Sequence, residues 1–251
     1  MGFRMKGSQE SNSISVLLLL IIVSSFWGCV QPSSTSSYAR KPEAVSDGLS
    51  DRPVKETKSV GLFSEDPATR RYLPYVRKFS EKYGVDWLLV LAVMKQESKF
   101  SHDAVSHQGA YGLMQIMPVT QIELTEKMGV EEAISPRNNI KAGIYHLRSL
   151  YDFFGKSRDE DRIKLTLAAY NAGLGRIDDA RKVARYLGND PKSWSAVKDA
   201  LPFLSSRNYS LHKNIWSDGQ PQNGYLRNWK QTVSYVENVL QFREELMLSQ
   251  D

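Results

Sequence analysis

Apolar residues recur at helical spacing from Pro67 to the C-terminus, and the two-residue alternation of a half-buried strand is absent from this region. In residues 135–155, for example, Ile140 and Ile144 fall on one face of a helix. A regular spacing of this kind over most of the chain predicts an all-α domain.

Cap and turn residues set the expected ends of these helices. Asp86 precedes an apolar stretch and can cap its first turn, while Gly84 and Gly155 can end two others. Residues 205–227 lack helical spacing and are expected to form a loop-rich insertion. The expected helices span residues 70–84, 87–100, 118–128, 135–155, 161–173, 176–188, 190–201 and 229–248.

The N-terminal segment has an export pattern. Arg4 and Lys6 precede an apolar run at residues 14–23, which is shorter than the about 20 residues that a membrane-spanning helix needs. A basic start followed by a short apolar run is typical of a secretory signal peptide. We therefore expect a signal peptide at residues 1–28.

The only cysteine, Cys29, directly follows Gly28, in an arrangement that resembles the lipobox of bacterial lipoproteins. Lipidation of Cys29 would attach the chain to a membrane. Phe26 and Trp27 depart from the usual lipobox residues, so an uncleaved anchor with an incidental thiol is the alternative. A single cysteine excludes an intramolecular disulfide framework.

The segment after Cys29 is rich in serine, proline, threonine and charge, and it has no apolar periodicity. Such a segment cannot bury enough surface to offset its ordering entropy. We expect residues 29–66 to comprise the lipidated cysteine and a flexible tether. The tether would let a catalytic domain at residues 67–251 reach beyond the membrane surface.

Composition limits the partners of this domain. The chain has 251 residues, of which 41% are hydrophobic, and a formal net charge of +5. The charges are interspersed, and neither a basic helix nor zinc-finger spacing is present, so no nucleic-acid partner is expected. No metal or other cofactor is expected either, because the histidines form no metal-ligand spacing. These histidines are His102, His107, His146 and His212.

One carboxylate extends an otherwise apolar helix face. Glu97 lies close in azimuth to Val90 and Val93. The neighbouring Lys95 and Lys99 point away from that face. Burial on an apolar wall raises the pKa of a carboxyl toward a value useful for a general acid. A glutamate at a frayed helix end that reaches into water is the alternative.

A series of motifs follows in a fixed order. "ESKF" contains Glu97, and "SHQGAYGLMQIMP", "NNIKAGIYHL" and "LAAYNAGLGRI" come after it. Taken alone, the second motif is a turn into a buried helix start, with Met114 and Met117 as core residues. Together the motifs resemble the catalytic domain of the lytic transglycosylases, over roughly Leu73 to Leu240.

The C-terminal part narrows this resemblance. "IDDARKVARYLGNDPKSWSAVKDALPFLS" and "SYVENVL" are similar to stretches of the subgroup called membrane-bound lytic transglycosylase F. Larger members of that subgroup carry an N-terminal solute-binding-like module. This chain leaves no room for that module, so regulation through it is not expected.

The resemblance implies a goose-lysozyme-like, all-α fold with a groove for a glycan strand. It implies cleavage of the β-1,4 bond between N-acetylmuramic acid and N-acetylglucosamine, with Glu97 as the single catalytic acid and base. Glu97 would protonate the leaving oxygen and then take the proton of the C6 hydroxyl, which closes a 1,6-anhydro ring without water. The matched motifs offer no second carboxylate, whereas ordinary glycosidases use two.

The resemblance also implies substrate-binding positions. Ser106 would lie near the N-acetyl group, and Gln115 and Met117 would shape the sugar site. Tyr170 and Asn171 lie at the end of a predicted helix, where the family's tyrosine faces the acid.

Several of these positions have structural alternatives. Ser106 would equally suit a loop cap, and Tyr170 a core tyrosine with a bonded hydroxyl. Tyr235 matches a further substrate-binding position. Gln231 and Val233 stand where the family has Glu and Arg, however, so any polar network built on those charges differs here.

These inferences predict a monomeric, lipid-anchored peptidoglycan lytic transglycosylase of the cell envelope. It would act on glycan strands at the periplasmic face of a bacterial membrane, as an outer-membrane lipoprotein. Two alternatives stay open: a lysozyme-type hydrolase that uses water on the same fold, and a non-catalytic wall-binding scaffold that keeps the groove.

Overall fold

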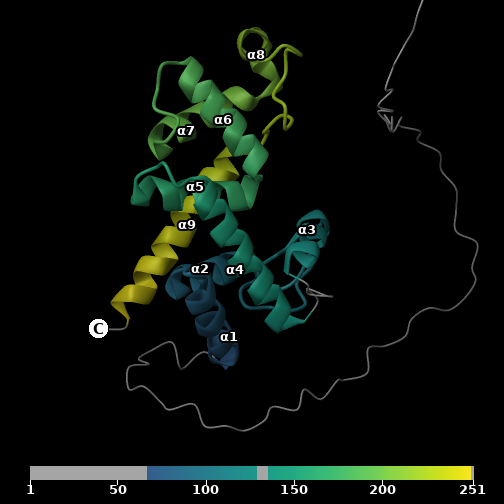
Figure 1. Cartoon of the computed structure of the whole chain (residues 1–251), viewed down its shortest axis with the longest axis vertical. Coiled ribbons are helices and arrows are strands. Elements are labelled where there is room, and N and C mark those ends of the chain that lie inside the picture. Colours follow the sequence, from purple (N-terminus) through teal and green to yellow (C-terminus); the bar gives the residue numbers. More distant parts are fainter. Residues whose placement is uncertain (1–66, 129–134, 250–251) are drawn as a thin grey trace, which may run out of the picture. The chain divides into compact units, whose positions relative to one another are not determined.

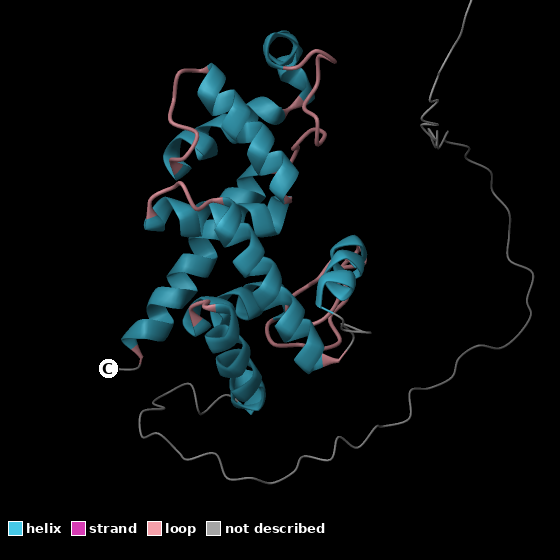
Figure 2. Cartoon of the chain, in the orientation of Figure 1, coloured by secondary structure: helices cyan, strands magenta, loops and turns pink. Residues whose placement is uncertain are grey.

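The computed structural model describes residues 67–128 and 135–249, and every regular element in these ranges is a helix (Figure 1, Figure 2). The elements are α1 Pro67–Tyr83, α2 Trp87–Ser98, α3 Pro118–Met128, α4 Pro136–Phe153, α5 Asp159–Ala172, α6 Leu174–Tyr186, α7 Trp194–Ala200, the 3-10 helices η2 Leu201–Leu204 and η3 Ser206–Asn208, α8 Tyr209–Ile215 and α9 Trp229–Leu248. The expected all-α class is confirmed for this part of the chain. No helix in it is long and apolar enough to cross a membrane.

The predicted N-terminal features cannot be compared with the structure. The signal peptide at residues 1–28, the lipidated Cys29 and the tether at residues 29–66 all lie outside the described ranges. They remain predictions from the sequence.

Local chemistry explains where the helices begin and end. At the start of α2, the Asp86 carboxylate accepts a hydrogen bond from the Leu88 N–H at 2.9 Å. Helix α1 ends at Tyr83 because Gly84 adopts a left-handed φ of 64°, which costs a glycine little. Both ends agree with the prediction, as do the bounds of α9.

One predicted loop is partly helical. Residues 205–227 contain η3 and α8, so the expectation of a loop-rich insertion is corrected there. His212 of α8 is fully buried, and its ring lies 5.6 Å from that of Trp216 and 5.8 Å from that of Tyr225. Contacts between aromatic rings stabilise this segment. The spacing of apolar residues along the sequence does not reveal such contacts.

Helix α2 lies in the middle of the hydrophobic core. Its residues 89–94 are all buried, and it packs against α9 and α1. A helix that is apolar on every side needs neighbours on every side. Burial is lower in the first turn, at Trp87 and Leu88, and again in the last turn, where Glu97 lies.

A buried asparagine fixes the loop that follows α2. Asn139 of α4 is 1% exposed, and its Oδ1 accepts a hydrogen bond from the Met114 N–H at 2.8 Å. Its Nδ2 donates to the Tyr111 carbonyl at 2.9 Å. Gly112 lies so close that a Cβ there would be 2.7 Å from the Asn139 amide. The loop is therefore held firmly against α4.

Candidate active site

Glu97 is placed where α2 leaves the core. Lys99 and Phe100, directly after the helix, adopt left-handed φ values of 50° and 65°. The Lys99 N–H closes the last turn by donating to the Lys95 carbonyl. Because the helix ends just after Glu97, this side chain lies at the boundary between the core and an open cleft.

The cleft has a volume of about 590 Å³. Its walls come from the end of α2, the loop before α3, the junction of α5 and α6, and the segment that leads into α9. The structure therefore gathers most of the predicted site residues in one place. These are Glu97, Ser106, Gln115, Met117, Tyr170 and Asn171.

The surroundings of Glu97 favour a protonated carboxyl. Burial raises the pKa of the Glu97 carboxyl to about 7, although a hydrogen bond from Tyr235 acts in the opposite direction. In that bond the Tyr235 hydroxyl donates to Oε1 at 2.6 Å. A carboxyl with a pKa near neutrality can both give and take a proton, as a general acid and base must.

Tyr235 contacts the acid from the protein side. It is 4% exposed and is not among the residues that line the cleft. Burial and the charge of Glu97 raise the pKa of the Tyr235 hydroxyl well above its ordinary value, so that it stays a neutral donor. This placement favours a role in positioning Glu97 over the predicted contact with substrate.

Tyr170 lines the cleft, but its hydroxyl is used elsewhere. It donates to the Met114 carbonyl at 2.7 Å, which ties α5 to the loop after α2. Burial and the Glu97 charge raise the pKa of Tyr170 well above its ordinary value. A hydroxyl has only one proton to donate, so the hydrogen bond that Glu97 accepts from a tyrosine comes from Tyr235 and not from Tyr170.

Two predicted sugar-binding residues also stabilise their own loop. Gln115 has a left-handed φ of 45°, and its Nε2 donates to the carbonyls of Ala104 at 3.0 Å and Gly112 at 2.9 Å. Strained backbone of this kind persists where its surroundings hold it, and it is common at functional sites. The Ser106 hydroxyl accepts a hydrogen bond from the Ala110 N–H at 3.0 Å, which leaves its proton available to a ligand.

The remaining predicted residues add polar and apolar surface. The Thr232 hydroxyl donates to the Asn171 Oδ1 at 3.0 Å and so orients that amide in the cleft. Met117 is 37% exposed and contributes an apolar contact surface. A sugar ring presents both hydroxyl groups and apolar faces, so a wall of this mixed character suits it.

Glu97 is the only carboxylate among the described residues that line the cleft. Glycosidases that use two carboxylates place them about 5 to 9.5 Å apart. The described ranges also contain no group of three or more His, Cys, Asp or Glu side chains that could hold a metal ion. Glu97 is therefore the one carboxyl group that the described lining of the cleft offers for chemistry, and His107 adds an imidazole.

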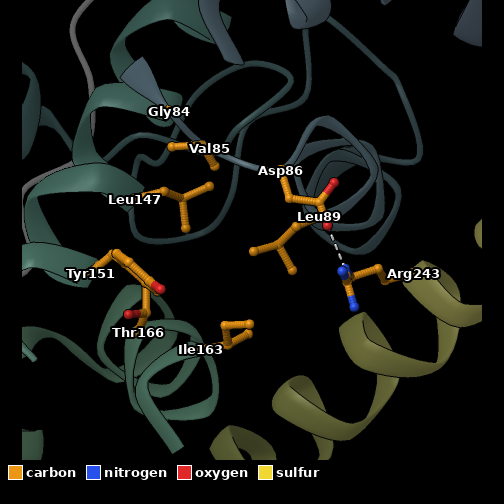
Figure 3. A pocket seen from close by; sticks show the side chains of 9 residues that line it. All are labelled: Gly84, Val85, Asp86, Leu89, Leu147, Tyr151, Ile163, Thr166 and Arg243. Atoms are coloured by element: carbon orange, nitrogen blue, oxygen red, sulfur yellow. Dashed lines mark hydrogen bonds and ion pairs between the residues drawn. The ribbon is translucent and has the colours of Figure 1, made fainter. Parts of the chain in front are cut away.

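A smaller cavity at the opposite end of α2 has a different character. It measures about 150 Å³, and apolar side chains such as Leu89, Leu147 and Ile163 surround it (Figure 3). Asp86 and Arg243 form an ion pair at its edge, at 2.5 Å. The carboxylate there is matched by a guanidinium, so this cavity offers no unpaired acid.

Sequence patterns did not identify every contributor to the cleft. Asn139 lies within the motif "NNIKAGIYHL", and the signal that could have found it is an amide on the apolar face of a helix. Arg176 lies within the motif "LAAYNAGLGRI" and Thr232 between Gln231 and Val233, but no pattern marked these residues or Arg227 as lining the cleft. Only the fold brings them to the acid.

Known proteins resemble this chain over the same region. The family described as Transglycosylase SLT domain matches residues 74–191. Membrane-bound lytic murein transglycosylase F of Desulfosudis oleivorans is 35% identical over 177 residues, which are 70% of this chain and 36% of that protein. The protein of that name from Histophilus somni (strain 129Pt) is 33% identical over 210 residues, which are 83% of this chain and 40% of the relative.

A solved structure is also similar. The 70 kDa soluble lytic transglycosylase of Escherichia coli is 24% identical with a TM-score of 0.49, and the match covers 71% of this chain and 25% of that one. The chain thus spans less than half the length of each of these proteins.

The family match and the site coincide. Residues 74–191 contain Glu97, the loop from Ser106 to Met117, and the pair Tyr170 and Asn171. The family expected from the motifs is thereby confirmed. Residues 74–191 of this chain therefore belong to the family described as Transglycosylase SLT domain.

Proposed function

We propose that this protein is a peptidoglycan lytic transglycosylase, which cleaves the β-1,4 bond between N-acetylmuramic acid and N-acetylglucosamine. The observation that carries this proposal is Glu97, a single carboxyl with a pKa of about 7 in an open cleft without a second carboxylate. The match to the SLT domain family supports the same function. It also supports the expected goose-lysozyme-like fold.

In the first step, protonated Glu97 donates its proton to the oxygen that links the two sugars. The bond from C1 of the muramic acid to that oxygen breaks, and the substrate's own N-acetyl group stabilises the positive charge at C1. With a pKa near 7, a large fraction of Glu97 carries the required proton at neutral pH. Tyr235 then stabilises the carboxylate that is left, since its hydroxyl donates to Oε1.

In the second step, ionised Glu97 takes the proton of the C6 hydroxyl of the same sugar. The C6 oxygen bonds to C1, the 1,6-anhydro ring closes, and Glu97 regains its proton. Water is neither needed nor consumed, which fits a site that has no second carboxylate to activate it. We assign Ser106, Gln115, Met117 and Asn171 to binding the sugars around this bond.

We also propose the cellular setting that the N-terminal sequence predicts. Residues 1–28 are a signal peptide, Cys29 is lipidated, and residues 29–66 tether a catalytic domain at residues 67–251. The protein then works as a monomer in the cell envelope, at the periplasmic face of the outer membrane. The relatives named membrane-bound transglycosylases support a place in the envelope.

Mass spectrometry of the products tests the activity. We expect the full-length protein to release 1,6-anhydromuramyl fragments from purified peptidoglycan, and folded Glu97→Gln to release none. Fragments with a reducing end would instead identify a hydrolase. Binding to peptidoglycan without any cleavage would identify a scaffold protein.

A further inference from the structure

Two arginines give the cleft more positive charge than Glu97, the one carboxylate among its described lining residues, can balance. Arg176 lies in the first turn of α6 and Arg227 in the segment before α9, and both line the cleft that holds Glu97. Neither forms an ion pair with any acidic side chain in the described ranges. Both are exposed, so a ligand in the cleft can reach them.

Arg176 is partly oriented by its own backbone. Its Nη1 donates to the Ala172 carbonyl at 3.0 Å, at the point where α5 meets α6. A guanidinium has five N–H donors, so most of them stay available. This contact holds the charged end of Arg176 at the Ala172 carbonyl, and both residues line the cleft.

The segment that carries Arg227 is anchored on α6. Asp179 of α6 is 0% exposed, and its Oδ2 accepts hydrogen bonds from the N–H of Asn223 at 2.8 Å and from its Nδ2 at 3.0 Å. Gly175 packs so tightly against the same asparagine that a Cβ would lie 2.1 Å from its Oδ1. Further along, the Leu226 N–H donates to a carbonyl of η2 at 3.2 Å. Arg227 is therefore presented by a fixed segment on the helix that carries Arg176.

Two guanidinium groups without an ion-pair partner indicate an anionic ligand. Guanidinium donors match the geometry of a carboxylate, and such charge-assisted bonds are stronger than neutral ones. A peptidoglycan strand offers carboxylates from two sources: the peptide stems, and the lactyl groups of muramic acids from which the stem has been removed. Neutral glycans of the same backbone offer neither.

We propose that Arg176 and Arg227 form a carboxylate-binding site that makes the cleft select acidic strands over neutral ones. The inference rests on the proposed function, because the glycan must occupy the cleft for its acidic groups to reach the arginines. Asp179 and Gly175 are positioning residues in this arrangement, since they act through the segment that carries Arg227.

The test compares three substrates with the full-length protein. They are strands with intact stems, strands stripped of stems by an amidase, and strands with intact stems whose carboxylates have been converted to methylamides. The variant is Arg176→Gln with Arg227→Gln. Arg185→Gln with Arg207→Gln is the control, because it removes the same net charge from exposed arginines that do not line the cleft.

The readout is the ratio of kcat/KM for an acidic strand to kcat/KM for the methylamide strand. We expect the wild type and the control to share a high ratio, and the cleft variant to lose about tenfold or more of it, mainly through KM. If the ratio falls for strands with intact stems, the arginines bind the stem carboxylates. If it falls for stripped strands, they bind the lactyl carboxylates. An unchanged ratio, or an equal loss in the control, would overturn the carboxylate site.

The same assay separates this inference from the proposed function. If the wild type releases 1,6-anhydro products while the cleft variant keeps the same kcat/KM ratio of acidic to methylamide strands, the arginine site is refuted. That result leaves the proposed function in place. Absence of cleavage of every substrate by the wild type refutes the proposed function, and the arginine site falls with it.

Discussion

The two ends of helix α2 carry carboxylates with opposite surroundings. Asp86 precedes the first turn and Glu97 lies in the last, and both meet a side chain of α9. The partner of Asp86 is the guanidinium of Arg243, whereas the partner of Glu97 is the neutral hydroxyl of Tyr235. The same pair of helices therefore builds an ion pair at one end and a proton-exchanging site at the other.

The helix itself strengthens this contrast. The N-terminal end of a helix favours negative charge and the C-terminal end disfavours it. Asp86 also caps α2 and lies beside a small cavity (Figure 3). Glu97 lines the larger cleft. Asp86 is paired with a cation, whereas burial beside a neutral partner raises the pKa of the Glu97 carboxyl, so the two carboxylates suit different functions.

The largest expected effect is that of Glu97→Gln on catalysis. General acid and base groups contribute about 10²- to 10⁴-fold to rate, so kcat/KM for glycan cleavage should fall at least about a hundredfold. Asp86→Asn is the matched change at the other end of α2, and we expect less than about a threefold loss, because asparagine also caps helices. Similar losses in the two variants would contradict the division between the ends.

The next effect concerns stability and pH. The pKa of Glu97 is about 7 in the folded protein and 4.5 ordinarily, so this group favours the folded state at low pH. That contribution is lost as the pH rises through 7, which lowers the free energy of unfolding by about 3 kcal/mol. Urea unfolding from pH 4 to pH 8 should show this fall in the wild type, and Glu97→Gln should remove it. An identical pH dependence in both proteins would mean that Glu97 is well hydrated.

Tyr235→Phe should produce a smaller change that is specific to the acid. Its hydroxyl stabilises ionised Glu97, so its removal raises the pKa of Glu97 further. The alkaline limb of the pH profile of kcat/KM then moves to higher pH, and kcat falls about tenfold with the loss of a hydrogen bond to a charged group. Tyr151→Phe, beside the small cavity, is the control, and the alkaline limb of its pH profile of kcat/KM should not move.

The smallest effect is expected at the ion pair. Arg243 and Asp86 are 32% and 33% exposed, and pairs of this exposure contribute about 1 kcal/mol or less. Arg243→Gln should therefore lower the free energy of unfolding by about that amount in a urea titration, and leave the pH profile of cleavage unchanged. A shifted profile would show that the two ends of α2 are coupled.

Much of the fold followed from local signals in the sequence. Asp86 and Gly84 predicted helix ends correctly because capping and left-handed turns depend on neighbouring residues. Helix α8 was missed, since its buried His212 is stabilised by aromatic rings and by the Phe203 carbonyl, which are irregularly spaced along the chain. Contacts of this kind have no period along the sequence.

The site was predictable to a similar extent. Glu97 was visible as a carboxyl on an apolar face, and the ordered motifs supplied its neighbours in the cleft. The different contacts of Tyr170 and Tyr235 were not visible, because both lie in helical motifs and only the structure shows that one hydroxyl meets the Met114 carbonyl and the other Glu97. Which carbonyl or carboxylate a hydroxyl meets depends on the packing of helices that are distant in sequence.

The bond between Tyr235 and Glu97 joins residues that are 138 positions apart. During synthesis or export, the segment with Glu97 emerges long before α9, and until α9 docks on α2 the carboxyl is neither covered nor hydrogen-bonded as described. An incompletely emerged chain therefore carries an ordinary hydrated glutamate at this position. Under the proposed function, the order of synthesis delays glycan cleavage until the last helix is in place, so an incomplete chain would not yet be active.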